Sequence, residues 1–229
     1  MMVIEDRRIR IITGHYGSGK TEFAVNYATM LAKLSGKKIA FADMDIVNVY
    51  FRSRQMRDMM SELGIYVMDS SINTYVEVPS IPAEMAVPFT DKSFDYVIDL
   101  GGNDVGAAVL GRYKDKMNLQ EIDFFMTVNV FRPDTTDIKK IIKEKEKIEH
   151  SSGIFITGFI NNSNLARGTL AKDILHGDRI LKEVSRITSV PIKYTTYVKE
   201  VVTDLTDEMR KELSGEVIPL QYFMREIWM

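Results

Sequence analysis

The chain has 229 residues, 30 basic and 32 acidic side chains, a formal net charge of −2 and no cysteine. This length fits one domain with a sizeable core, spanning residues 1–229. The balanced charge gives no strong nucleic-acid signal, and the lack of cysteine excludes disulfides, thiolate metal sites and a cysteine nucleophile.

The first predicted strand, Arg8 to Thr13, runs directly into a glycine-rich motif of the GxxxxGK[ST] type. The motif consists of Gly14, His15, Tyr16, Gly17, Ser18, Gly19, Lys20 and Thr21. In such a turn the backbone N–H groups point at phosphate oxygens, and the helix predicted over 20–34 adds its positive dipole end. We expect Lys20 to reach the β- and γ-phosphates and the Thr21 hydroxyl to ligate Mg²⁺.

The second predicted strand, residues 38–42, ends in two carboxylates, Asp43 and Asp45. Because strand side chains alternate, both should share one face. Beside a bound triphosphate, that face would orient an attacking water and support the metal. Surface capping is the alternative for these two residues.

A further predicted strand, residues 96–99, ends in Asp99 and is followed by Gly101 and Gly102. This pattern is typical of a second metal-binding element beside a phosphate loop. We expect Asp99 to accept a hydrogen bond from an Mg²⁺-bound water or to approach the ion directly. The N–H of Gly102 would then face the γ-phosphate.

The remaining β-branched runs alternate with helical patterns, which predicts an α/β fold with a mainly parallel, twisted sheet flanked by helices. Asp134 is the expected cap of its helix. The segment 70–91 carries three prolines and is expected to be an irregular surface crossover. The further strands are expected at 65–68, 124–129, 154–160 and 191–194, and the further helices at 51–62, 104–116, 134–149, 168–187 and 204–213.

The two ends of the chain give no membrane signal. The start carries Glu5 and Asp6 where a signal peptide would be basic, and no apolar run approaches 18 residues. The apolar tail 218–229 offers only Arg225 as a basic residue, so packing against the sheet or a partner chain is favoured over membrane binding. A cytoplasmic protein is expected.

Together, the phosphate loop, Asp43-x-Asp45, the Asp99-containing strand and the run Gly158-Phe159-Ile160-Asn161 resemble the MinD/ParA group of P-loop ATPases, the CobQ/CobB/MinD/ParA nucleotide-binding domain. The resemblance covers nearly the whole chain. It implies a three-layer P-loop NTPase fold, with ATP and Mg²⁺ at the carboxyl ends of the strands. It also implies slow ATP hydrolysis coupled to a nucleotide-dependent homodimer or to an unidentified protein client.

The same resemblance implies roles for particular residues. Asp45 would assist the water, Asp43 and Asp99 would surround the metal, and Asn161 or Asn162 would read the base. His15 stands where many members have a second lysine that reaches the partner's phosphates. Histidine is shorter and mostly neutral at pH 7, so that mechanism is in doubt; His15 is expected near a dimer face and to make hydrolysis slow.

Three alternatives remain open. The Gly-Ser-Gly-Lys-Thr string is similar to nickel-metallochaperone GTPases, but Asn164 stands where a guanine-reading Asp would be, which favours ATP. An ATP-dependent small-molecule ligase or kinase, similar to dethiobiotin synthetase and cobyrinate synthase, uses the same scaffold. The third alternative is a scaffold that binds nucleotide without hydrolysis.

Overall fold

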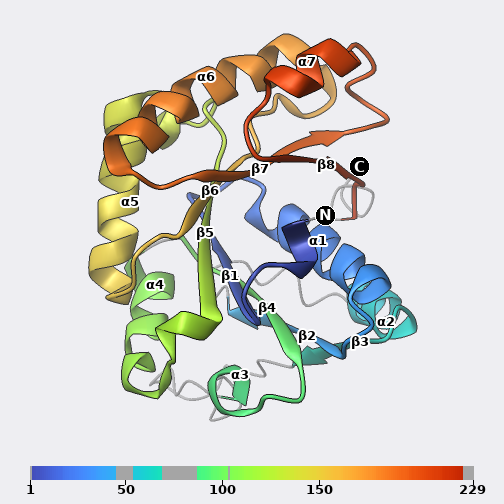
Figure 1. The fold of residues 1–229 in the computed structure, drawn as a ribbon, viewed down its shortest axis with the longest axis vertical. Helices are drawn as coiled ribbons and strands as arrows, with labels where there is room; N and C mark the ends of the chain where they lie inside the picture. Colours follow the sequence, from blue (N-terminus) through green and yellow to red (C-terminus); the bar gives the residue numbers. More distant parts are fainter. Residues whose placement is uncertain (1, 45–53, 69–86, 103, 224–229) are drawn as a thin grey trace.

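An eight-stranded parallel sheet organises the part of the chain that the computed structural model describes, residues 2–44, 54–68, 87–102 and 104–223 (Figure 1). Its order is β3-β2-β4-β1-β5-β6-β7-β8, and each neighbouring pair is parallel. This confirms the expected α/β fold with a parallel sheet. The strands are β1 (Ile9–Thr13), β2 (Ile39–Met44), β3 (Ile65–Met68), β4 (Asp95–Leu100), β5 (Ile122–Val128), β6 (Gly158–Asn161), β7 (Ile192–Val198) and β8 (Glu216–Leu220).

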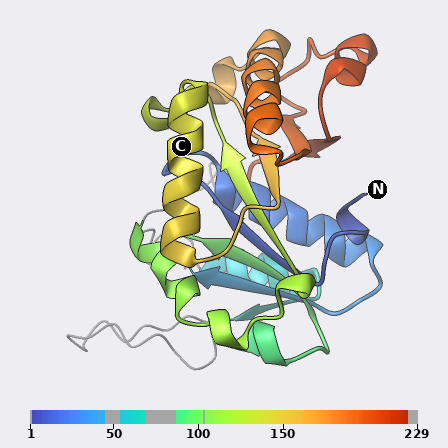
Figure 2. The same cartoon turned by 60° about the vertical axis from the view of Figure 1, so that its left-hand side comes forward.

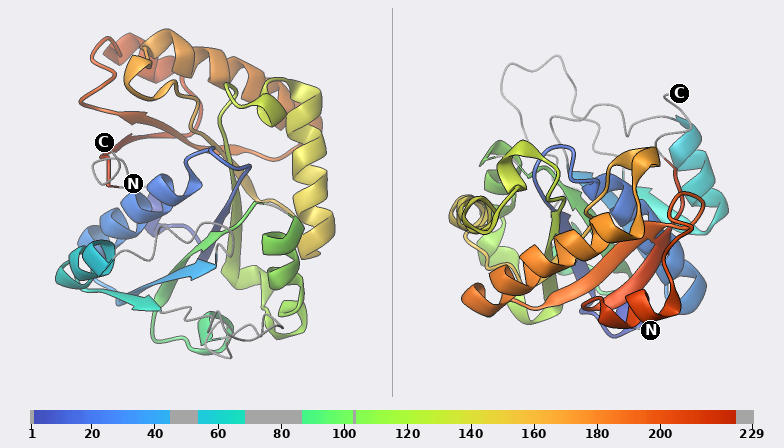
Figure 3. Two further views of the ribbon diagram at one scale, coloured as in Figure 1. Left: turned by 180° about the vertical axis from the view of Figure 1, so that it is seen from behind. Right: turned by 90° about the horizontal axis from the view of Figure 1, so that it is seen from above.

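Helices cover both faces of the sheet. In the view from above, α1 and α2 lie on one side and α4 and α5 on the other (Figure 3). Helix α6 packs beside α5 on that second face (Figure 2). The helices are α1 (Lys20–Leu34), α2 (Arg54–Glu62), α3 (Val87–Thr90), α4 (Asp104–Gly111), α5 (Ile138–Ser152), α6 (Ala171–Thr188) and α7 (Asp207–Glu212), with 3-10 turns at Met2–Ile4, Lys114–Lys116, Leu119–Glu121, Pro133–Thr135 and Ala166–Gly168. None of the helices in these residues is long and apolar enough to cross a membrane.

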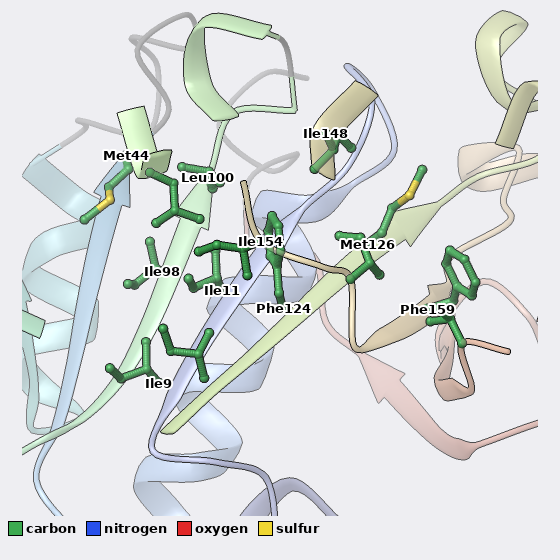
Figure 4. Packing of buried hydrophobic residues seen from close by; sticks show 14 of the residues in the cluster. Ile9, Ile11, Met44, Ile98, Leu100, Phe124, Met126, Ile148, Ile154 and Phe159 are labelled. Carbon is green, nitrogen blue, oxygen red and sulfur yellow. The ribbon is translucent and has the colours of Figure 1, made fainter. Parts of the chain in front are cut away.

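The central strands are apolar on both faces because both faces are covered. In β1, Ile9 and Ile11 pack with Phe124 of β5 and with the helices of the α5 side (Figure 4). Ile12 instead packs under α1. The same alternation in β4 turns Val97 toward the α1 side. Because residues two apart share a face, Asp99 also lies on the side of α1, the helix that begins with the phosphate loop.

Predicted elements differ from the observed ones in several places. The strand expected from Ile154 begins only at Gly158, because Ser152 Oγ and Glu149 Oε1 accept the N–H groups of Ile154 and Ile156 in place of a neighbouring strand. The apolar tail contributes β8, in which Ile218 is buried under α1. In the expected crossover, residues 69–86 lie outside the described residues, and Val87–Thr90 form the helical turn α3.

Candidate nucleotide-binding site

The phosphate-loop motif forms the turn between β1 and α1. Gly17 and Gly19 have φ values of 75° and 84°, a conformation that glycine adopts at little cost. Helix α1 begins at Lys20, and Gly19 at its N-cap has no side chain that would satisfy the first N–H groups. The loop therefore leads into a helix start without a side-chain cap, an arrangement of the kind that binds an anion.

The end of β4 lies directly against this loop. A Cβ atom at Gly102 would overlap the carbonyl of Gly14, so only glycine fits there. A Cβ atom at Gly19 would likewise overlap Asn162 Nδ2. The main chain of Gly14 and the side chain of Asn162, in the loop after β6, therefore leave no room for a Cβ atom at Gly102 or Gly19.

Lys20, Thr21 and Asp99 come together at the base of the loop. The Thr21 hydroxyl donates to Asp99 Oδ2 at 2.6 Å, and Lys20 Nζ lies 3.4 Å from Asp99 Oδ1. Asp99 is fully buried. Asp43 ends up opposite Asp99 in the β2–β4 register and is also buried, whereas Asp45 lies outside the described residues.

Thr21, Asp99 and Asp43 are oxygen donors of the kind that Mg²⁺ prefers. They do not resemble the ligand set of a metal that is fully enclosed by protein side chains. Among the described residues, no group of three or more His, Asp or Glu side chains is placed to hold a metal. Mg²⁺ commonly takes few protein ligands and completes its shell with phosphate oxygens and waters. The Thr21 hydroxyl bonded to the strand-end carboxylate of Asp99, next to an anion-binding turn, matches that requirement.

The loop after β5 contacts the tip of the phosphate loop. Arg132 Nε donates to the Gly17 carbonyl at 2.8 Å, and His15 Nε2 lies 3.0 Å from Asp134 Oδ2. The expected cap role of Asp134 is therefore wrong. Residues 133–135 form a 3-10 turn, and Asp137 caps α5 by accepting the Lys140 N–H.

The asparagines after β6 have their side chains bonded within the protein. Asn162 Nδ2 donates to the Ser18 carbonyl at 2.7 Å, and its Oδ1 accepts from Thr196 Oγ1 at 2.6 Å. Asn161 Nδ2 donates to the Ile174 carbonyl, and its Oδ1 accepts the Ser163 N–H. Base reading by Asn161 or Asn162 stays a prediction, while the observed bonds of Asn162 fix the phosphate loop.

A cavity of about 390 Å³ extends from the phosphate loop toward β7 and β8. Its volume is within the range typical of small-molecule sites. The phosphate-loop end includes Gly17, Gly19, Lys20, Thr21 and Arg132, and Tyr16 stands at the rim with 78% of its surface exposed. The rest of the wall is largely apolar and includes Ala166, Ile174, Tyr197, Val198, Val201, Val202, Leu220 and Tyr222.

Of the predicted site residues, the cavity wall contains Tyr16, Gly17, Gly19, Lys20, Thr21 and Asn162. Gly14, His15, Ser18, Asp43, Asp99, Gly102 and Asn161 lie outside that wall. Sequence reasoning missed Arg132, Thr196 and Tyr222. The pattern Arg-Pro-Asp after β5 was the available signal for Arg132, and no local signal marked the other two.

Comparisons with known proteins support the fold. No family model and no curated protein matches the chain. Among solved structures, chloroplast FtsY from Physcomitrella patens is 18% identical over 82% of this chain and 57% of that one, with a TM-score of 0.54. FtsY from Mycoplasma mycoides is 19% identical over 81% and 59%, with a TM-score of 0.52.

The cell division protein FtsY from Thermotoga maritima is 18% identical over 82% of this chain and 60% of that one, with a TM-score of 0.51. The chain therefore spans less than two thirds of the length of these structures. At this level of identity the likeness extends to the fold, which agrees with the P-loop NTPase fold expected from the sequence. It does not single out the MinD/ParA group, so that narrower assignment stays a prediction.

Proposed function

We propose that this chain binds ATP with Mg²⁺, hydrolyses it slowly and uses the bound state as a switch for a client protein. The observation that carries the proposal is the contact of Thr21 with Asp99, and of Lys20 with both, at the base of an uncapped glycine-rich turn. Without a ligand, the charge of Lys20 is balanced by the buried carboxylate of Asp99. A triphosphate would give its ammonium group a second set of anionic partners.

Each residue of the site has a proposed role in hydrolysis. The loop N–H groups and Lys20 would stabilise negative charge on the transferred phosphoryl group. Mg²⁺, when bound, would supply further positive charge that stabilises the transferred phosphoryl group. Thr21 would contact the ion, Asp99 and Asp43 would accept hydrogen bonds around it, and Asp45 and Asp43 would orient the attacking water.

The cavity supports ATP over GTP. Glu22 is the one carboxylate among the described cavity-wall residues, and it accepts the backbone N–H of Phe223. Asn164 donates to the Asn162 carbonyl and accepts the Ala166 N–H, so its side chain is bonded within its own loop. Proteins that select guanine commonly use a carboxylate that accepts two N–H groups of the base. No described residue of this wall offers a carboxylate placed for that contact.

A nucleotide-dependent homodimer is part of the proposal. Tyr16 at the cavity rim and Leu165 and Leu170 in the adjoining loop expose 78%, 48% and 43% of their surfaces, which supports a contact surface on this side. In that arrangement His15 would lie near the interface. A His15→Ala variant with unchanged turnover and unchanged dimerisation would contradict this role.

The decisive experiment is titration calorimetry of the full chain with Mg-ATP, followed by phosphate release with and without candidate metabolites. Lys20→Ala should weaken binding roughly 10- to 100-fold, because hydrogen bonds to charged groups contribute about 1.5–3 kcal/mol. Lys143→Ala, an exposed lysine on α5, is the matched control. Retention of wild-type affinity and rate in Lys20→Ala would overturn the assignment. Turnover only with a metabolite would favour a ligase or kinase, and binding without phosphate release would favour a scaffold.

A further inference from the structure

The chain beyond β8 returns to the first turns of α1. The Gln221 N–H donates to Asn26 Oδ1 at 2.8 Å, and Asn26 Nδ2 donates back to the Gln221 carbonyl at 2.9 Å. One turn earlier on α1, Glu22 Oε1 accepts the Phe223 N–H at 2.5 Å. Asn26 is 5% exposed, so its two bonds with Gln221 are shielded from water. Two side chains of the phosphate-loop helix therefore fix the backbone of residues 221–223.

This attachment puts Tyr222 into the cavity wall. Leu220, which pairs with Val198 in the β7–β8 register, lines the same cavity as Tyr222 two residues later. Alternate residues of an extended segment point to the same side, which accounts for the pair. Gln221 between them is exposed. The backbone bonds to Asn26 thus determine which side of the segment faces the cavity.

Tyr222 is the aromatic residue best placed for the nucleoside half of a ligand. In the proposed function Lys20 and Thr21 would hold the phosphate half, which leaves the apolar part of the cavity wall for the base and ribose. In that wall Tyr197 is only 7% exposed, and its ring faces the Arg210 guanidinium at 5.2 Å. Tyr222 is half-buried at the cavity surface. A flat purine gains from contact with such a ring.

We propose that Tyr222 contacts the base or ribose of the bound nucleotide and that Asn26 is its positioning residue. The inference rests on the proposed nucleotide binding and extends it to a part of the chain outside the phosphate-loop and strand-end motifs. It predicts that the affinity for nucleotides depends on Tyr222, whereas the affinity for inorganic tripolyphosphate, which has no base or ribose, does not.

The test compares Mg-ATP with Mg-tripolyphosphate on the full chain by calorimetry. Tyr222→Ala should weaken Mg-ATP binding roughly ten-fold, the order that aromatic contacts with bases contribute, and leave Mg-tripolyphosphate binding unchanged. Tyr222→Phe should bind both ligands as the wild type does. Tyr66→Ala removes a tyrosine that is 60% exposed and absent from the cavity wall, and it should also leave both affinities unchanged.

Asn26→Ala tests the positioning role. It should reproduce the selective loss of Mg-ATP affinity, and the double variant with Tyr222→Ala should bind no worse than Tyr222→Ala alone, because both changes remove one contact. Melting curves check that Asn26→Ala is folded. Wild-type Mg-ATP affinity in Tyr222→Ala, or an equal loss for both ligands, would overturn the inference. If the wild-type protein binds neither ligand, the proposed function itself fails, a result that is seen without any variant.

Discussion

Asn162 is the residue whose observed bonds most change the interpretation of the site. Its Nδ2 donates to the Ser18 carbonyl inside the phosphate loop, and its Oδ1 accepts from Thr196. Asn162→Asp would replace the donor with a carboxylate that faces a carbonyl oxygen. We expect this variant to weaken Mg-ATP and Mg-tripolyphosphate binding equally, by roughly ten-fold, because a buried carbonyl left without its donor costs about 1–3 kcal/mol.

The comparison of ligands separates the two roles proposed for Asn162. If Asn162 positions the loop, the ratio of ATP to GTP affinity stays constant in Asn162→Asp while both affinities fall. If it reads the base, as the family resemblance implies, that ratio changes and tripolyphosphate binds normally. Asn118→Asp, at an exposed position before β5 and absent from the cavity wall, is the matched control.

At the residue scale, the sequence identified the groups that lie close together along the chain or at strand ends. Lys20 and Thr21 follow from the spacing of one motif, and Asp99 follows from its place at the end of an apolar strand. Arg132 bonds Gly17 of the phosphate loop, and Thr196 bonds Asn162. In each pair the two residues are more than 30 positions apart in the sequence. Such contacts depend on which strands become neighbours, and a single sequence does not contain that information locally.

At the scale of elements, strand order was the missing information. Alternating strands and helices predicted the parallel sheet, because each crossover must pack on a sheet face. β8 was not predicted as a strand because Pro219 interrupts its pattern, and proline suits an edge strand such as β8. The cap of α5 was misassigned because Asp134 and Asp137 both precede an apolar helical pattern. Only the intervening 3-10 turn decides between them.

Glu121, which directly precedes β5, forms ion pairs with residues at the amino-terminal ends of β1 and β4. Its Oε2 accepts from Arg8 Nη2 at 2.8 Å, next to β1, and its Oε1 lies 3.1 Å from Lys92 Nζ before β4. The hydrogen bond from Arg8, followed by that from Lys92, lowers the pKa of Glu121 to about 2. A lowered folded-state pKa contributes stability above the unfolded value near 4.3, and this stability is lost as the pH falls toward 2.

We therefore expect Glu121→Gln to lower the free energy of unfolding by about 1 kcal/mol at pH 7, a modest value because the group is near the surface. The difference from the wild type should shrink between pH 4.3 and pH 2. Urea denaturation at pH 7 and pH 3 measures both values. Glu146→Gln, an exposed residue of α5, is the control and should have no effect. A difference that is the same at both pH values would show that the ion pairs are not its source.

At the scale of the whole molecule, Asp6 connects the first residues of the chain with α1 and β7. Its carboxylate accepts hydrogen bonds from Tyr27 and Tyr194 and lies 3.1 Å from Lys193 Nζ, while its carbonyl accepts from Arg10. The two tyrosine rings pack with Phe23 and Phe125 under α1. Segments 188 positions apart in the sequence thus meet at one buried carboxylate, on the α1 side of the sheet.

The two phenols should make the folded state sensitive to alkali. Burial, with the Asp6 charge as a further cause, raises the pKa of Tyr27 and of Tyr194 well above the usual value near 10. A raised folded-state pKa means that stability is fully present below pH 10 and falls above it, because only the unfolded chain releases these protons. Each such phenol contributes about 1.4 kcal/mol per pH unit to that fall.

Tyr194→Phe should lower the free energy of unfolding by about 1–2 kcal/mol at pH 7, since Asp6 loses a donor. Above pH 10 it should also reduce the slope of stability against pH by about one proton, so that the variant and the wild type converge. Urea denaturation between pH 7 and pH 11 measures both effects, with Tyr66→Phe at an exposed position as the control. Curves that run parallel over this range would contradict the prediction, because they would mean that Tyr194 ionises in the folded protein as readily as in the unfolded chain.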